Sequence, residues 1–120
     1  MSKKFKHISK SSEKFLEKYL NTPSPTGFES AGQKVWLDYI EPYIDSHIVD
    51  TYGSVVGIIN PEAKYKVVIE AHADEISWFV HYITDNGFIY LRRNGGSDHQ
   101  IAPSKSCLLY TSDAADDRDS

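Results

Sequence analysis

Two side chains near the middle of the chain have the types and the spacing of a metal-binding pair. His72 follows the continuously apolar residues 67–69, and Asp74 comes two positions after it. A neutral imidazole is a good ligand for zinc or cobalt. A carboxylate two residues further on can hold the other ring nitrogen, which fixes the tautomer, or it can orient a water bound to the metal. The pair therefore predicts a metal site with His72 as the ligand.

Taken alone, the pair also has a simpler interpretation. A histidine beside an aspartate is more often a hydrogen-bonded structural pair than part of a metal site. The remaining candidates fit structural roles better than chemical ones. We interpret Glu70 and Glu75 as solvated or salt-bridged, Trp78, Phe79 and Tyr82 as packing residues, and Arg92 and Arg93 as a solvated strand end, and we assign no metal role to His7, His47, His81 or His99.

The periodicity of the first forty residues predicts two helices that precede this pair. Apolar side chains fall on one helical face from about residue 11 to residue 20, and the proline-rich residues 21–25 end that helix. Thr26 and Glu29 have the spacing of a capping box, which predicts a second helix that stops near Pro42. Its expected buried face consists of Ala31, Val35, Trp36, Tyr39 and Ile40.

The pattern then changes to strands. We expect strands over residues 48–50, 54–59 and 66–71, and a hairpin whose strands are residues 76–84 and 87–91. Residues 67–69 are continuously apolar, which is typical of a strand buried on both faces. Ligand sites in open α/β sheets lie at the carboxyl ends of strands, where His72 would stand. The sequence predicts an α/β sheet whose later strand–helix units are missing.

Composition narrows the class of protein. The formal net charge is −4 and 40% of the residues are hydrophobic, so we expect a globular protein that binds neither nucleic acid nor a membrane surface. No apolar run approaches the roughly 18 residues of a membrane span. The basic first ten residues lack the apolar core of a secretory signal. We therefore expect a cytoplasmic protein, and its single cysteine, Cys107, excludes an internal disulfide.

The last residues differ from the rest. From about Ser106 the periodicity stops, and residues 107–116 match a translated frame of a common transposon-end sequencing adapter. We therefore expect residues 106–120 to be an artefactual, unpacked tail, and we assign no function to Cys107 or to the terminal aspartates. The alternative is a natural acidic disordered tail.

Four segments read together resemble one enzyme family. Residues 24–29 (SPTGFE) are similar to the S-P-[ST]-G-x-E signature of the glutamyl and deblocking aminopeptidases, metallopeptidase family forty-two, which includes the large tetrahedral aminopeptidases. Residues 50–54 (DTYGS) resemble its D-x-x-G-N turn, with Ser54 where asparagine is usual. Residues 72–76 (HADEI) and 95–100 (GGSDHQ) resemble its H-x-D-E-I and G-G-x-D-x-Q segments. Their order and spacing agree over roughly residues 12–105.

The resemblance implies a fold and an activity. It implies the truncated N-terminal part of a three-layer α/β catalytic domain, zinc-peptidase-like (phosphorylase/hydrolase-like), whose full-length parent holds two divalent metal ions, zinc or cobalt. His72 would bind one metal, and Asp74 would be the catalytic-site aspartate that supports it. The parent would remove N-terminal residues from peptides and form a homo-oligomer. The general base and the other ligands would lie beyond the truncation, so we expect the chain itself to be inactive.

The domain boundaries and the alternatives follow. Residues 1–105 would be the partial catalytic domain, with residues 92–105 as the start of an inserted β domain. The nearest alternative is another co-catalytic zinc hydrolase, such as an aminoacylase, a carboxypeptidase or a relative labelled endoglucanase, although no paired carboxylates support glycoside hydrolysis. A different class is a non-enzymatic interaction protein in which His72 and Asp74 form a structural pair.

Overall fold

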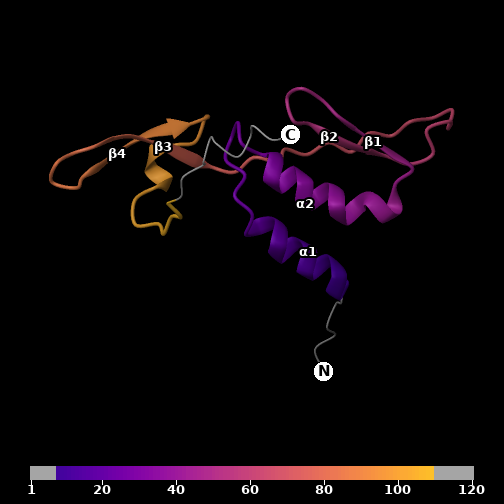
Figure 1. The fold of residues 1–120 in the computed structure, drawn as a ribbon, viewed down its shortest axis with the longest axis horizontal. Helices are drawn as coiled ribbons and strands as arrows, with labels where there is room; N and C mark the ends of the chain where they lie inside the picture. Colours follow the sequence, from indigo (N-terminus) through magenta and orange to yellow (C-terminus); the bar gives the residue numbers. More distant parts are fainter. Residues whose placement is uncertain (1–7, 110–120) are drawn as a thin grey trace, which may run out of the picture.

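Two helices open the described part of the chain, residues 8–109 of a computed structural model (Figure 1). Helix α1 spans Lys10–Leu20, and helix α2 spans Ser30–Ile40 and continues into a short 3-10 turn, η1, at Glu41–Tyr43. Ser9 caps α1, because its hydroxyl oxygen accepts a hydrogen bond of 3.0 Å from the amide of Ser12. The predicted first helix is confirmed to within one residue.

The two helices pack against each other through aromatic rings. Phe15 of α1 stacks on Tyr39 of α2 with ring centroids 4.1 Å apart. The hydroxyl groups of Ser12 and Tyr39 lie 2.9 Å from each other, within hydrogen-bond distance. On the expected apolar face of α2, Ala31 is exposed and the other four side chains are only half-buried, so that face is incompletely covered.

A short antiparallel ribbon follows α2. Strands β1 (Ser46–Val49) and β2 (Val55–Ile58) pair in the register His47 to Gly57. Gly57 lies beneath the C-terminal part of α2 and the turn after it: a Cβ atom there would stand 2.6 Å from Cδ1 of Ile40 and 3.1 Å from Cγ2 of Ile44. The missing side chain thus lets the helix lie close to the ribbon.

A second ribbon forms the other end of the molecule. Strands β3 (Ser77–Ile83) and β4 (Ile89–Asn94) pair antiparallel, with a bulge between Val80 and Tyr82. Gly87 takes φ +82° in the connecting turn, a backbone region that favours glycine. This confirms the predicted hairpin. A short 3-10 turn, η2, follows at His99–Ile101.

The predicted strand over residues 66–71 is wrong for this chain. These residues form no regular element, and the side chains of Val67, Val68 and Ile69 are 88%, 82% and 95% exposed. A central strand needs hydrogen-bonding neighbours on both sides. The described sheets are two separate two-stranded ribbons, β1–β2 and β3–β4, and neither pairs with this segment. The apolar run therefore crosses between the ribbons as exposed chain without regular structure.

The described residues contain no helix long and apolar enough to cross a membrane. Of the predicted tail, residues 106–109 carry no regular structure and residues 110–120 lie outside the described part. The boundary at Ser106 therefore stays a prediction.

Candidate metal-binding site

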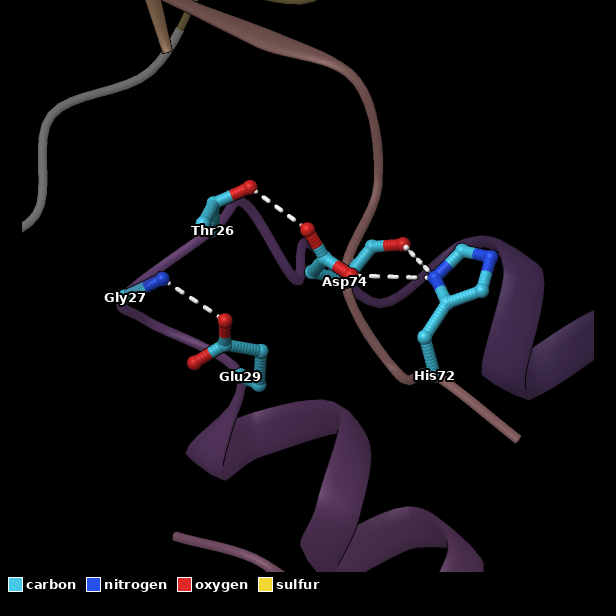
Figure 2. Close-up of polar contacts among 5 residues, drawn as sticks. All are labelled: Thr26, Gly27, Glu29, His72 and Asp74. Atoms are coloured by element: carbon cyan, nitrogen blue, oxygen red, sulfur yellow. Dashed lines mark hydrogen bonds and ion pairs between the residues drawn. The ribbon is translucent and has the colours of Figure 1, made fainter. Parts of the chain in front are cut away.

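The structure brings His72 and Asp74 together, as predicted. Nδ1 of His72 lies 2.9 Å from Oδ1 of Asp74 and 3.0 Å from the Asp74 backbone oxygen (Figure 2). Both of these oxygens are hydrogen-bond acceptors, so the proton of the neutral ring must sit on Nδ1. Nε2 then carries the free lone pair that a metal ion requires. The His72 side chain is 85% exposed.

Asp74 is held from its other side by a residue far away in the sequence. The hydroxyl group of Thr26 donates a 2.6 Å hydrogen bond to Oδ2 of Asp74 (Figure 2). This bond, followed by the contact with His72, lowers the pKa of Asp74 below its ordinary value, because both stabilise the ionised carboxylate. Asp74 therefore stays charged at pH values where a free carboxyl group would begin to protonate.

The position of Thr26 corrects the predicted capping box. Helix α2 begins at Ser30, and its N-cap residue Glu29 makes no side-chain cap. The Glu29 carboxylate instead accepts a 2.7 Å hydrogen bond from the amide of Gly27. The Thr26 hydroxyl is committed to Asp74, so it is not the cap of the helix. The spacing of Thr26 and Glu29 alone could not show whether Thr26 caps the helix or binds Asp74.

Ser24 anchors the same loop beside the site. Its amide donates to Oε1 of Glu75 at 3.0 Å, and its carbonyl oxygen accepts from the amide of Glu75 at 2.9 Å. Ser24 is buried against helix α2, where a Cβ atom on Gly32 would collide with the Ser24 hydroxyl. Glu75 is exposed, in keeping with the solvated or salt-bridged role expected from the sequence, and in addition it anchors Ser24.

Asn94 at the end of β4 is the residue that sequence reasoning missed. Its amide nitrogen Nδ2 donates to the carbonyl oxygen of Thr26 at 2.9 Å and lies 3.0 Å from the hydroxyl of Ser77. Nothing in the local pattern marks this residue, because its partners are distant in sequence. Arg93 is exposed, and its guanidinium donates a 2.7 Å hydrogen bond to the Ser97 carbonyl oxygen, consistent with the expected solvated strand end.

The donor set fits the beginning of a metal site but not a complete one. A pocket of about 140 Å³ lies beside the pair, lined in part by Tyr19, Thr22, His72 and Asp74. Within residues 8–109, no group of three or more His, Cys, Asp or Glu side chains could together hold a metal ion. In the described part of the chain, His72 and Asp74 are therefore a pair without a third candidate ligand beside them.

Comparison with known proteins decides the family. The family described as M42 glutamyl aminopeptidase matches residues 53–116, which is more than half of the chain. The chain belongs to the M42 family. This confirms the resemblance found in the sequence, and its members are aminopeptidases and hence hydrolases. The matched range includes His72 and Asp74 and reaches beyond the predicted boundary at Ser106.

Two relatives of this M42 chain show how much of a family member it spans. A protein of Acetivibrio thermocellus described as "Putative aminopeptidase" is 31% identical over 81 residues, which are 68% of this chain and 24% of that protein. The crystal structure of a TET aminopeptidase from the marine sediment archaeon Thaumarchaeota archaeon SCGC AB-539-E09 has a TM-score of 0.67 and 27% identity, covering 74% of this chain and 25% of that one. The chain thus spans about a quarter of each, and the structural likeness confirms the predicted truncated α/β fold.

Proposed function

We propose that this chain is the N-terminal part of an aminopeptidase that uses two divalent metal ions, zinc or cobalt, to remove N-terminal residues from peptides. The observation that carries the proposal is the contact between His72 and Asp74 in a member of the M42 family. It leaves Nε2 of His72 unprotonated and open to solvent, as a metal ligand must be. We also propose that the whole protein assembles as a homo-oligomer.

The chemistry divides between the metal pair and the side chains that prepare its site. Two bound divalent ions would lower the pKa of a shared water and polarise the scissile carbonyl group. In this chain His72 would hold one ion through Nε2. Asp74 accepts the hydrogen bond from Nδ1–H, which leaves Nε2 as the unprotonated nitrogen of the neutral ring and fixes the plane of the ring. Asp74 acts through His72, because its two carboxylate oxygens are already engaged by Thr26 and His72.

The chain by itself should not catalyse peptide hydrolysis. Catalysis needs several fixed ligands and a positioned general base. The described residues supply one ligand, His72, and one supporting carboxylate, Asp74. Weak metal affinity and no turnover are therefore the expected properties of the 120-residue chain.

A side-by-side assay tests this function. The chain and the longer protein encoded by the continuing reading frame are purified, supplied with zinc or cobalt, and assayed with aminoacyl-p-nitroanilides. We expect metal-dependent turnover only in the longer protein. There His72→Ala should lower activity by at least about 100-fold, the upper range for loss of a residue supporting a metal site. His81→Ala, an exposed histidine on β3, is the matched control and should change little.

Two outcomes would contradict the proposal. Turnover by the 120-residue chain that is lost on His72→Ala would mean that its site is complete. Full activity of the longer protein after His72→Ala would remove His72 from the metal site and leave the structural-pair interpretation.

A further inference from the structure

We propose that Thr26 is a positioning residue of this site: its hydroxyl group fixes the Asp74 carboxylate, which in turn holds His72 in the tautomer that leaves Nε2 free. The inference rests on the proposed function only in naming a metal ion as the group that Nε2 binds. Thr26 lies 48 residues before Asp74 in the sequence, and their contact is a side-chain hydrogen bond of 2.6 Å.

The geometry of the carboxylate supports this role. Oδ2 of Asp74 accepts from the Thr26 hydroxyl, and Oδ1 faces Nδ1 of His72 at 2.9 Å (Figure 2). The two partners occupy different oxygens of the same group. A rotation of the carboxylate about its Cβ–Cγ bond would therefore disturb both contacts together. Loss of the hydroxyl removes the restraint on one oxygen and frees the other to turn away from His72.

The loop around Thr26 is built to hold the hydroxyl in place. Gly27 takes φ +89°, a left-handed conformation, and the amide of Phe28 donates to the carbonyl oxygen of Pro25 at 2.8 Å, closing a tight turn. The Glu29 carboxylate accepts from the amide of Gly27 at 2.7 Å. The residue after Thr26 is thus fixed through its backbone (Figure 2).

Two further contacts anchor the loop to the end of β4 and to the residue after Asp74. Asn94 of β4 donates to the Thr26 carbonyl oxygen at 2.9 Å. On the other side, Ser24 and Glu75 exchange hydrogen bonds of 3.0 and 2.9 Å. The loop is therefore anchored at Ser24, at the carbonyl oxygen of Thr26 and at Gly27. These anchors fix the position from which the Thr26 hydroxyl reaches Asp74.

The test compares the tautomer of His72 in matched variants. Thr26→Val keeps the branched shape and removes the donor, whereas Thr26→Ser keeps the donor and removes a methyl group. Thr84→Val is the control, because the Thr84 hydroxyl serves only the β3–β4 turn, where it accepts from the amide of Phe88 at 3.0 Å. The 120-residue chain is labelled with ¹⁵N-histidine and studied without metal at about pH 8, where an ordinary histidine is neutral.

The ¹⁵N shifts of the two ring nitrogens report which one carries the proton. We expect the Nδ1–H form to dominate in the unchanged chain, in Thr26→Ser and in Thr84→Val. In Thr26→Val the ratio of the Nδ1–H form to the Nε2–H form should fall about fivefold, the factor that one ordinary hydrogen bond contributes. An unchanged ratio in Thr26→Val, or an equal loss in Thr26→Ser, would overturn the role of the hydroxyl.

A second measurement uses only the unchanged chain, so it tests the proposal even if the Thr26→Val variant does not fold. In the unchanged chain, a nuclear Overhauser effect should join the Thr26 methyl protons to the Asp74 β protons; its absence overturns the proposal. Neither readout requires metal or peptide. If the longer protein shows no metal-dependent turnover while the tautomer still follows Thr26, the proposed function fails and the positioning role stands.

Discussion

At the scale of single residues, the site depends on side chains that find partners far along the sequence. The sequence placed His72 and Asp74 together because two residues of spacing suffice for their contact. It assigned Thr26 to a helix cap and gave Asn94 no role. A hydroxyl or an amide can bond several partners, and its choice is set by tertiary structure rather than by local pattern. These two residues could therefore not be assigned from the sequence.

Asn94→Asp should loosen the loop that carries Thr26. The substitution keeps the size of the side chain but replaces the donor to the Thr26 carbonyl oxygen with an acceptor. An unsatisfied, repelled carbonyl oxygen costs about 1–3 kcal/mol. We expect amide hydrogen exchange of Phe28 and Glu75 to accelerate by about tenfold or more. Asn86→Asp in the β3–β4 turn is the control, and equal exchange rates in the two variants would argue against the Asn94 anchor.

At the scale of elements, the sequence predicted those helices and strands whose stabilising contacts lie close by in the sequence. Helix α1 and the hairpin of β3 and β4 were predicted because an apolar helical face and a glycine turn are signals that act within a few residues. Residues 66–71 were predicted as a strand from their apolar character, and that was wrong because strand formation depends on neighbouring strands, which residues 8–109 do not provide. The apolar character of residues 66–71 indicates that they are buried in a larger structure, but it does not show which strands would pair with them.

The turn between β1 and β2 should respond to pH through Asp50. Its Oδ1 accepts hydrogen bonds of 2.8 Å from the amide of Ser54 and 2.9 Å from that of Tyr52. These bonds, that of Ser54 first, lower the pKa of Asp50 below its ordinary value. Because folding lowers the pKa of Asp50, its carboxylate stabilises the turn fully at pH values above the ordinary pKa of aspartate. This stabilisation is lost as the pH falls through the lowered pKa of the folded chain.

The measurement is an NMR titration of the Ser54 and Tyr52 amide shifts. We expect one transition with a midpoint below the ordinary pKa of aspartate. Asp50→Asn keeps the acceptor oxygen without a titrating group, so the transition should disappear while the turn persists. A midpoint at or above the ordinary value would contradict the hydrogen-bonding pattern.

The exposed segment between the ribbons should promote self-association. Tyr65, Val67, Val68 and Ile69 are each more than 80% exposed and belong to no helix or strand. Exposed apolar chain with unpaired backbone favours association between molecules. Val68→Lys should lower the weight-average mass measured by analytical ultracentrifugation at a given concentration, because a charge in this segment opposes its association between molecules. Ile59→Lys changes a 69% exposed residue outside this segment and serves as the control. The idea fails if both variants associate alike.

At the scale of the whole molecule, residues 8–109 form an open framework. Its radius of gyration is 18.7 Å, against about 13–14 Å for a compact domain of this length. The described residues include no buried hydrophobic side chain. The β3–β4 ribbon lies at one end of this framework, and the β1–β2 ribbon lies with the two helices at the other (Figure 1). We infer that the rest of an M42 protein supplies the missing apolar contacts and the missing metal ligands.

The most direct measurement is anomalous X-ray diffraction from crystals of the longer protein grown with zinc or cobalt. We predict a metal peak within coordination distance, about 2.0–2.1 Å for zinc, of Nε2 of His72. Asp74 should remain on Nδ1 and Thr26 on Asp74, and a second peak should lie about 3.5–4 Å from the first. A structure in which His72 points into an apolar core, away from Asp74 and from any metal peak, would contradict the account.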